Sequence, residues 1–233
     1  MIRAAILLAA GRGKRQRPYT DRTPKPLLPV SGRPMLDYVL AAVQRAGIER
    51  ACIVTNHLEE QIRDYVGDGS RWKMQATYAH QNELRGNGDA LLSVPREWIP
   101  AEPILVVATD YILEEDSLFE LVEMHQKRSA DITMSLKECP RQELSARSSV
   151  EVSGDWRVRK IIEKPKLEEI LSPYAASIMF IFPPAIWEYL PEVEPSPRGE
   201  IELQSAVQSM LEDGYQAYGV LQPAPHEWIP PTT

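Results

Sequence analysis

Residues 5–30 concentrate the side chains of this chain that are best suited to binding a polyphosphate. An apolar run over residues 5–10 leads into the glycine-rich, basic loop Gly11–Arg17, and the segment Pro24-Lys25-Pro26 follows. Glycines let backbone N–H groups close around an anion, and arginine offers a planar fork for phosphate oxygens. The segment therefore indicates a strand that ends in a cationic, phosphate-binding loop.

Two common phosphate loops do not fit this segment. A Walker loop needs Gly, four residues and then Gly-Lys-Ser/Thr, but Gly13-Lys14 is followed by Arg15, and Leu8 stands five residues before Gly13. The dinucleotide fingerprint G-x-G-x-x-G requires a glycine where Gln16 stands. Both kinds of phosphate loop are therefore disfavoured. Because the dinucleotide fingerprint is incomplete, an oxidoreductase that depends on a nicotinamide is disfavoured as well.

A carboxylate follows another predicted buried strand. Asp110 comes directly after Thr109 and the apolar run Ile104–Ala108. In open parallel sheets, ligands bind beyond the carboxyl ends of the strands. Mg²⁺ prefers oxygen donors and is often held by one or two carboxylates together with substrate phosphates. Asp110 is therefore a candidate Mg²⁺ ligand, whereas a plain turn residue is the structural alternative.

The pattern of the first segment resembles the signature of the sugar-1-phosphate nucleotidyltransferases. That signature is an apolar strand, G-x-G-T-R-L-x-P-x-T, a short gap and then P-K-P. The matching residues are Gly11, Gly13, Arg15, Pro18, Thr20, Pro24, Lys25 and Pro26. Lys14 and Gln16 stand where the family usually has Thr and Leu.

The resemblance implies roles for residues in the first half of the chain. Arg15 and Lys25 would be catalytic, with Arg15 stabilising the pyrophosphate end and Lys25 neutralising the α-phosphate. The nucleotide-binding residues would be Ala10, Gly11, Gly13, Gln81 and Gly86. The Gln81 amide offers a donor and an acceptor, which suits the edge of uracil or thymine, so UTP or dTTP is favoured.

The resemblance extends to Glu163-Lys164-Pro165, which matches the family's E-K-P. Lys164 would hold the sugar phosphate, and Glu163 would accept hydrogen bonds from sugar hydroxyls. Asp110 would bind Mg²⁺. The implied reaction is in-line attack of a sugar 1-phosphate oxygen on the α-phosphorus of the nucleoside triphosphate, which gives NDP-sugar and pyrophosphate. No protein nucleophile is required, so catalysis would rest on positioning and charge neutralisation.

The chain departs from the family where a second metal carboxylate is usual. Residues 199–203 fit the start of G-E-[LI]-x-[IL]-T-D, but Ser205 replaces the Asp. In the terminal W-x-D-x-G-T, Pro230 replaces the Asp. Either Asp110 and phosphates hold the metal alone, or a substitute serves, the candidates being Glu202, His226 and Glu227.

Two expected glycines of the sugar pocket are also missing, with Ser148 and Ser177 standing near their positions. The identity of the sugar therefore stays open. The choice between UTP and dTTP also stays open, because Gln81 does not distinguish uracil from thymine. These losses keep a second reading, a regulatory subunit that binds nucleotide sugar on the same fold without turnover. The enzyme is favoured by the retention of four residues that a pure binding module does not all need, namely Arg15, Lys25, Asp110 and Lys164.

Strand-like and helix-like stretches alternate along the chain, which predicts a mainly parallel sheet with helices on both faces. We expect an α/β fold, a Rossmann-like three-layer α/β/α sandwich with a mixed sheet. One domain would span 1–233, with about 1–140 binding nucleotide and about 141–233 binding sugar phosphate. Strands are expected over residues 2–9, 51–55, 74–79, 104–108, 132–136, 150–152, 158–162, 177–182 and 215–221. Helices are expected over 34–46, 57–66, 89–94 and 201–212, and a further helix is expected to start at Ser117 and to continue at least to His125.

Composition limits the class of partner. The 233 residues carry a net charge of −7, which argues against a general nucleic-acid binder. No apolar run approaches the length of a membrane span, no signal peptide is evident, and Cys52 and Cys139 form no disulfide framework. We expect a cytoplasmic enzyme whose partners are a nucleoside triphosphate and a sugar 1-phosphate. A homo-oligomer is expected only by analogy with the family.

Overall fold

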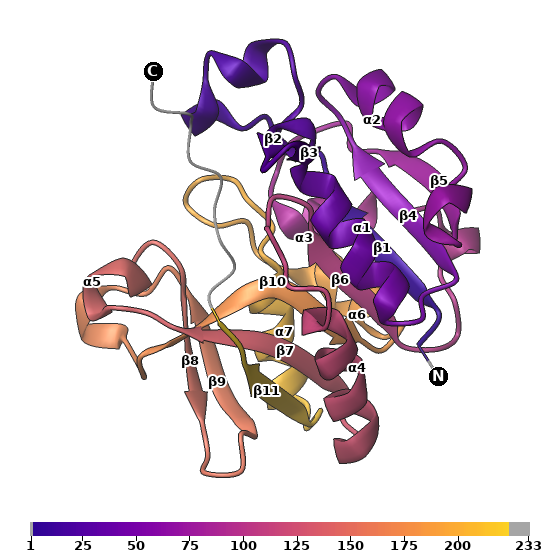
Figure 1. Ribbon diagram of the computed structural model, residues 1–233. Coiled ribbons are helices and arrows are strands. Elements are labelled where there is room, and N and C mark those ends of the chain that lie inside the picture. The colour runs from indigo at the N-terminus through magenta and orange to yellow at the C-terminus, as the bar shows by residue number, and fades with distance from the viewer. Residues whose placement is uncertain (1, 224–233) are drawn as a thin grey trace.

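A seven-stranded sheet forms the centre of the computed structural model, which describes residues 2–223 (Figure 1). From one edge to the other, the strands are ordered β11-β7-β10-β6-β1-β4-β5. Their bounds are β1 Ala4–Leu8, β4 Arg50–Thr55, β5 Gln75–His80, β6 Ile104–Ala108, β7 Ile132–Glu138, β10 Tyr174–Phe182 and β11 Ala217–Leu221. Because β1 and β6 are neighbours, the loops that follow them start at the same edge of the sheet.

The sheet is mixed, as the sequence predicts. Strands β6, β1, β4 and β5 pair in parallel, and β11 pairs in parallel with β7. Strand β10 is antiparallel to both of its neighbours, β6 and β7. Strand β10 therefore joins the parallel strands β6, β1, β4 and β5 to the parallel pair β7 and β11.

Alternate side chains of the central strands face two separate cores. In β1, Ala4 and Ile6 belong to one core, whereas Ala5 and Leu7 belong to the other. Helices α1 (Met35–Arg45), α2 (Glu59–Val66) and α4 (Ser117–Arg128) cover one face. Helices α3 (Asn87–Leu92), α6 (Ile186–Tyr189) and α7 (Leu203–Glu212) cover the other. This arrangement confirms the predicted three-layer sandwich, in which an apolar strand is buried on both faces.

Short elements complete the fold. Strands β8 (Ser148–Val152) and β9 (Val158–Glu163) form an antiparallel hairpin that projects from the end of the molecule opposite β4 and β5 (Figure 1). A second small hairpin consists of β2 (Pro29–Val30) and β3 (Arg33–Pro34), and α5 (Arg141–Leu144) precedes β8. No helix within residues 2–223 combines the length and apolarity that crossing a bilayer requires.

The sequence Ser117-Leu-Phe-Glu120 fits the S-x-x-E pattern of a capping box, but this prediction is wrong. Ser117 is the first residue of α4, Asp116 takes the N-cap position, and no side chain caps the helix. Instead, the amide of the buried Gln222 donates hydrogen bonds to the Ser117 carbonyl and to the Glu120 carboxylate. The Ser117 and Glu120 groups that the local pattern assigned to a helix cap therefore bind Gln222, which lies more than a hundred residues away in the chain.

Candidate functional site

A cavity of about 500 Å³ opens at the carboxyl ends of β1 and β6. This is where an open parallel sheet is expected to bind a ligand. Six of the residues that the sequence singles out line it, namely Ala10, Gly11, Lys25, Gln81, Gly86 and Asp110. Four others, Gly13, Arg15, Glu163 and Lys164, do not line it.

Lys25 and Asp110 meet inside the cavity. The Lys25 ammonium donates a hydrogen bond of 2.5 Å to Asp110 Oδ2, and the two residues lie 85 positions apart in the chain. The lysine side chain is 14% exposed and the aspartate 37%, so the pair is partly shielded from water. Opposite charges at this distance neutralise each other and leave one carboxylate oxygen, Oδ1, unengaged by that lysine. The arrangement places the Lys25 ammonium and a carboxylate oxygen of Asp110 next to each other in the cavity.

Gly13 positions Lys25 rather than contacting the cavity. Its φ is +59°, and a Cβ at this position would lie 2.8 Å from Thr20 Cγ2 and 3.1 Å from Lys25 Cβ. The Thr20 hydroxyl also donates a 2.8 Å hydrogen bond to the Gly13 carbonyl. The glycine therefore lets the loop after β1 pack against the segment that carries the lysine.

The basic loop presents different cations to the cavity from those that the motif indicates. Arg15 lies in the short 3₁₀ helix Lys14–Gln16 and is exposed outside the cavity lining. Arg12 and Lys14 line the cavity in its place. The sequence marked the loop as cationic, but the direction of each side chain depends on the turn at Gly13, which the sequence pattern does not specify.

Gln81 is buried under the loop that precedes α3. Its side-chain amide donates hydrogen bonds to the Gly86 carbonyl (3.1 Å) and to Asp89 Oδ2 (2.8 Å). Arg85 in turn donates to Asp89 Oδ1 from Nη2 (2.9 Å) and Nε (3.2 Å). The amide hydrogens that were expected to reach a base are therefore used within the protein.

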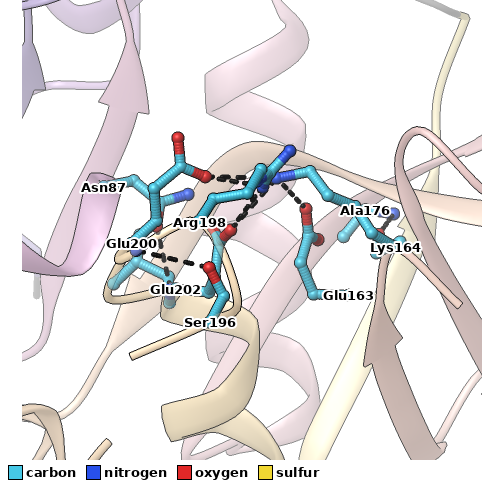
Figure 2. Close-up of polar contacts among 10 residues, drawn as sticks. Asn87, Glu163, Lys164, Ala176, Ser196, Arg198, Glu200 and Glu202 are labelled. Atoms are coloured by element: carbon cyan, nitrogen blue, oxygen red, sulfur yellow. Dashed lines mark hydrogen bonds and ion pairs between the residues drawn. The ribbon is translucent and has the colours of Figure 1, made fainter. Parts of the chain in front are cut away.

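Beside the cavity lies a cluster of five charged side chains, Glu163, Lys164, Arg198, Glu200 and Glu202. Figure 2 shows Lys164 and Arg198 converging between the three carboxylates. Lys164 Nζ lies 3.0 Å from Glu202, 3.3 Å from Glu163 and 3.5 Å from Glu200. Arg198 Nη2 lies 2.5 Å from Glu200 and 2.9 Å from Glu202. Of the five, Glu200 also lines the cavity, so it connects the charged cluster to the cavity.

Burial changes the titration of two of these carboxyls. Desolvation raises the pKa of Glu163 to about 8, and the negative charge of Glu202 adds to the increase. Desolvation and contact with Glu200 raise the pKa of Glu202 to about 7. Glu163 Oε2 is buried and has no hydrogen-bond partner within the part of the chain that the structure describes. The cluster therefore retains a proton more readily than isolated glutamates would.

Arg198 is a site residue that motif matching did not single out, and Glu200 was matched only as the Glu of the incomplete motif at residues 199–203. They belong to the turn 196–200, in which the Ser196 amide donates to the Glu200 carbonyl at 2.9 Å. The only signal in the sequence was an arginine directly before the Gly-Glu of a weakly matched motif. Their proximity to Lys164 results from packing of this turn against the end of β9, which local sequence does not reveal.

The nucleotidyl transferase family model matches residues 4–228, almost the whole chain. The chain belongs to the nucleotidyl transferase family. It is 32% identical over 211 residues to the low-salt glycan biosynthesis nucleotidyltransferase Agl11 of Haloferax volcanii, covering 90% of this chain and 57% of that protein. It is 33% identical over 211 residues to the UTP–glucose-1-phosphate uridylyltransferase AglF of the same organism, covering 90% and 84%.

A third relative is the glucose-1-phosphate thymidylyltransferase of Streptomyces griseus, 32% identical over 213 residues, with 90% of this chain and 58% of that protein covered. The chain spans about half the length of several curated relatives that it matches, at 57%, 50% and 47%. A crystal structure of UDP-glucose pyrophosphorylase complexed with UDP-glucose superimposes with a TM-score of 0.83 at 23% identity, covering 94% of this chain and 90% of that one. The structural match supports the fold of this nucleotidyl transferase.

The donor chemistry of the cavity fits a hard divalent cation. The Asp110 carboxylate lies at the strand end, and the Glu200 carboxylate lines the same cavity. Glu202 does not line it and is instead paired with Lys164 and Arg198. No group of three metal-ligating side chains occurs among residues 2–223, and the candidates His226 and Glu227, like Pro230, lie outside the described residues. A cation held by Asp110 would therefore need further oxygen ligands, such as phosphates.

Proposed function

We propose that this chain transfers a nucleotidyl group from a nucleoside triphosphate, UTP or dTTP, to a sugar 1-phosphate, with release of pyrophosphate. The observation that carries the proposal is the Lys25–Asp110 pair in a cavity at the strand ends. Membership of the nucleotidyl transferase family supports the reaction type. Relatives named as a UTP–glucose-1-phosphate uridylyltransferase and a glucose-1-phosphate thymidylyltransferase support these substrate classes.

The two halves of the chain would hold different substrates. The first 140 residues or so contribute almost all of the cavity lining and would bind the nucleotide. The second part contributes Glu163, Lys164 and Arg198, which would bind the sugar phosphate. Glu200 and Glu202 pair with both Lys164 and Arg198, so an incoming phosphate would compete with these carboxylates.

Catalysis would rest on charge neutralisation and alignment. A sugar 1-phosphate oxygen forms a bond to the α-phosphorus, and the bond from that phosphorus to the pyrophosphate oxygen breaks. Lys25 would neutralise the α-phosphate and the incoming phosphate. Arg12 and Lys14, which line the cavity, would hold the pyrophosphate, and Arg15 stays a predicted contributor from its exposed position.

Mg²⁺ is the cofactor that we propose for this reaction, with Asp110 as its protein ligand. When bound, the ion would reduce the negative charge of the phosphates that share it. Lys25 occupies Asp110 Oδ2, so its ammonium and a cation would share one carboxylate.

The second candidate function, a non-catalytic regulatory subunit, has no support in these comparisons, because the three relatives named above are all named as transferases. The cytoplasmic location and the homo-oligomeric state stay predictions. A mixture test separates the two functions. An enzyme releases pyrophosphate from a nucleotide and a sugar phosphate, whereas a sensor binds nucleotide sugar without doing so.

Substitution of Lys25 by methionine tests the role of the pair. Methionine keeps most of the aliphatic stem but removes the charge, so we expect turnover to fall at least about 100-fold while the fold is retained. Lys127→Met on the exposed side of α4 is the matched control and should stay within about twofold of the wild type. The measurements are pyrophosphate release and the thermal unfolding midpoint. Near-wild-type turnover in Lys25→Met would show that the Lys25–Asp110 pair has no role in catalysis.

A further inference from the structure

The orientation of the Gln81 amide is fixed by two groups that can only accept hydrogen bonds. Its nitrogen faces the Gly86 carbonyl at 3.1 Å and Asp89 Oδ2 at 2.8 Å. A flipped amide would place its oxygen against a carbonyl and a carboxylate, which is repulsive. Both hydrogens of the amide nitrogen are therefore used within the protein.

Asp89 is itself held in place. Its side chain is 9% exposed, and both Nη2 and Nε of Arg85 donate to its Oδ1. This leaves Oδ2 directed at Gln81. An ion pair of this geometry restricts the rotation of the carboxylate. Arg85 thus supports Asp89, and Asp89 supports Gln81.

The remaining polar atom of Gln81 is its oxygen. Gln81 lines the cavity, and within residues 2–223 its Oε1 accepts no hydrogen bond. Gln81 therefore offers a ligand an acceptor, not a donor. A nucleobase that meets this oxygen must provide a hydrogen.

We propose that Asp89 is a positioning residue for base selection, because it fixes Gln81 as an acceptor and so favours a base with a ring N–H over cytosine. This rests on the proposed function, in which the cavity binds the nucleotide. Uracil and thymine carry N3–H, whereas the corresponding nitrogen of cytosine carries a lone pair, which the Gln81 oxygen would repel. A site built around one hydrogen bond rejects a base that cannot make it.

The variant Asp89→Asn tests this assignment. An asparagine that accepts from Arg85 through Oδ1 directs its Nδ2 at Gln81, which favours the turned amide with its nitrogen toward cytosine N3, although the Gly86 carbonyl still favours the original orientation. We expect the ratio of kcat/KM for UTP over CTP to fall at least about tenfold, about the effect of one hydrogen bond. Glu83→Gln is the matched control. It removes a carboxylate that pairs with the same Arg85 at 3.1 Å but does not contact Gln81, and it should leave the ratio unchanged.

Failure of the inference and failure of the proposed function give different results. If the wild type releases pyrophosphate and Asp89→Asn keeps its selectivity, the positioning role is wrong. If the wild type releases none with any pair, the function is wrong, and calorimetric binding of UTP and CTP alone then tests the selectivity. If Asp89→Asn does not fold, the affinity of the wild type for UTP is compared with its affinity for a UTP analogue that has C–H in place of N3–H. At least tenfold weaker binding than UTP supports the role, and equal binding overturns it.

Discussion

At the scale of single residues, the charged cluster beside the cavity shows why its members cannot be assigned separately. Three carboxylates, Glu163, Glu200 and Glu202, share two cations, so one negative charge has no counterpart. Burial makes that excess charge costly and raises the pKa of Glu163 and of Glu202. Protons therefore bind to the group as a whole.

Glu163→Gln should become more stable relative to the wild type as the pH rises from 5 to 8. Burial raises the folded-state pKa of Glu163 from 4.5 to about 8. Between these values the unfolded chain has lost the proton and the folded chain still holds it, so wild-type stability falls with rising pH. Glutamine does not titrate, and the difference in unfolding free energy should grow by at least about 1 kcal/mol, close to one pKa unit.

Urea unfolding at pH 5 and pH 8 measures this difference. Glu188→Gln on the exposed side of α6 is the control and should show no such growth. A difference for Glu163→Gln that stays constant, or that shrinks toward pH 8, would mean that Glu163 is ionised in the folded protein throughout this range.

At the scale of elements, a backbone clasp joins the two halves of the site. The Ile201 amide donates to the Arg85 carbonyl at 2.6 Å, and the Gly88 amide donates to the Ile201 carbonyl at 2.9 Å. The Asn87 side chain also accepts a hydrogen bond from the Leu203 amide, across 116 residues. The clasp fixes the loop that covers Gln81 against the segment that carries Glu200 and Glu202.

Gly86→Ala should break this clasp. Gly86 has φ +99° and ψ −177°, and a Cβ there would lie 2.7 Å from the Ile201 carbonyl oxygen. Backbone strain and the clash together should cost about 3 kcal/mol of unfolding free energy or more. Gly214→Ala is matched to it, with φ +93° but no atom within 4 Å of the added Cβ, and should cost about 1 kcal/mol. Equal costs in denaturant unfolding would show that close packing at Gly86 is unimportant.

Elements that depend on local pattern were predictable, and contacts between them were not. The apolar run Ile104–Ala108 is β6 with the predicted bounds, because a short buried strand has a distinct composition. Helix α2 begins at Glu59, two residues later than predicted, after Leu58 adopts φ +53°. The clasp at Ile201 could not be predicted, because backbone atoms of distant segments form it and no side-chain pattern marks them.

At the scale of the whole molecule, strand order explains why distant motifs form one cavity. Strands β1 and β6 are neighbours at the centre of the sheet, so the loop after β1 and Asp110 after β6 meet although 85 residues separate Lys25 from Asp110. The sequence predicted both motifs at strand ends, and six of the residues that it singled out line the cavity. The direction of Arg15 and the charged partners of Lys164 required the folded structure.

The central claim is that a nucleotide and a sugar 1-phosphate react in this cavity. The most direct test is pyrophosphate release from the purified chain with Mg²⁺, crossing UTP, dTTP, CTP and GTP with a panel of hexose, aminohexose and heptose 1-phosphates. We predict release with UTP or dTTP and at least one sugar phosphate, with little from CTP. Absence of release from every pair, together with measurable binding of a nucleotide sugar, would contradict the account and favour a regulatory subunit.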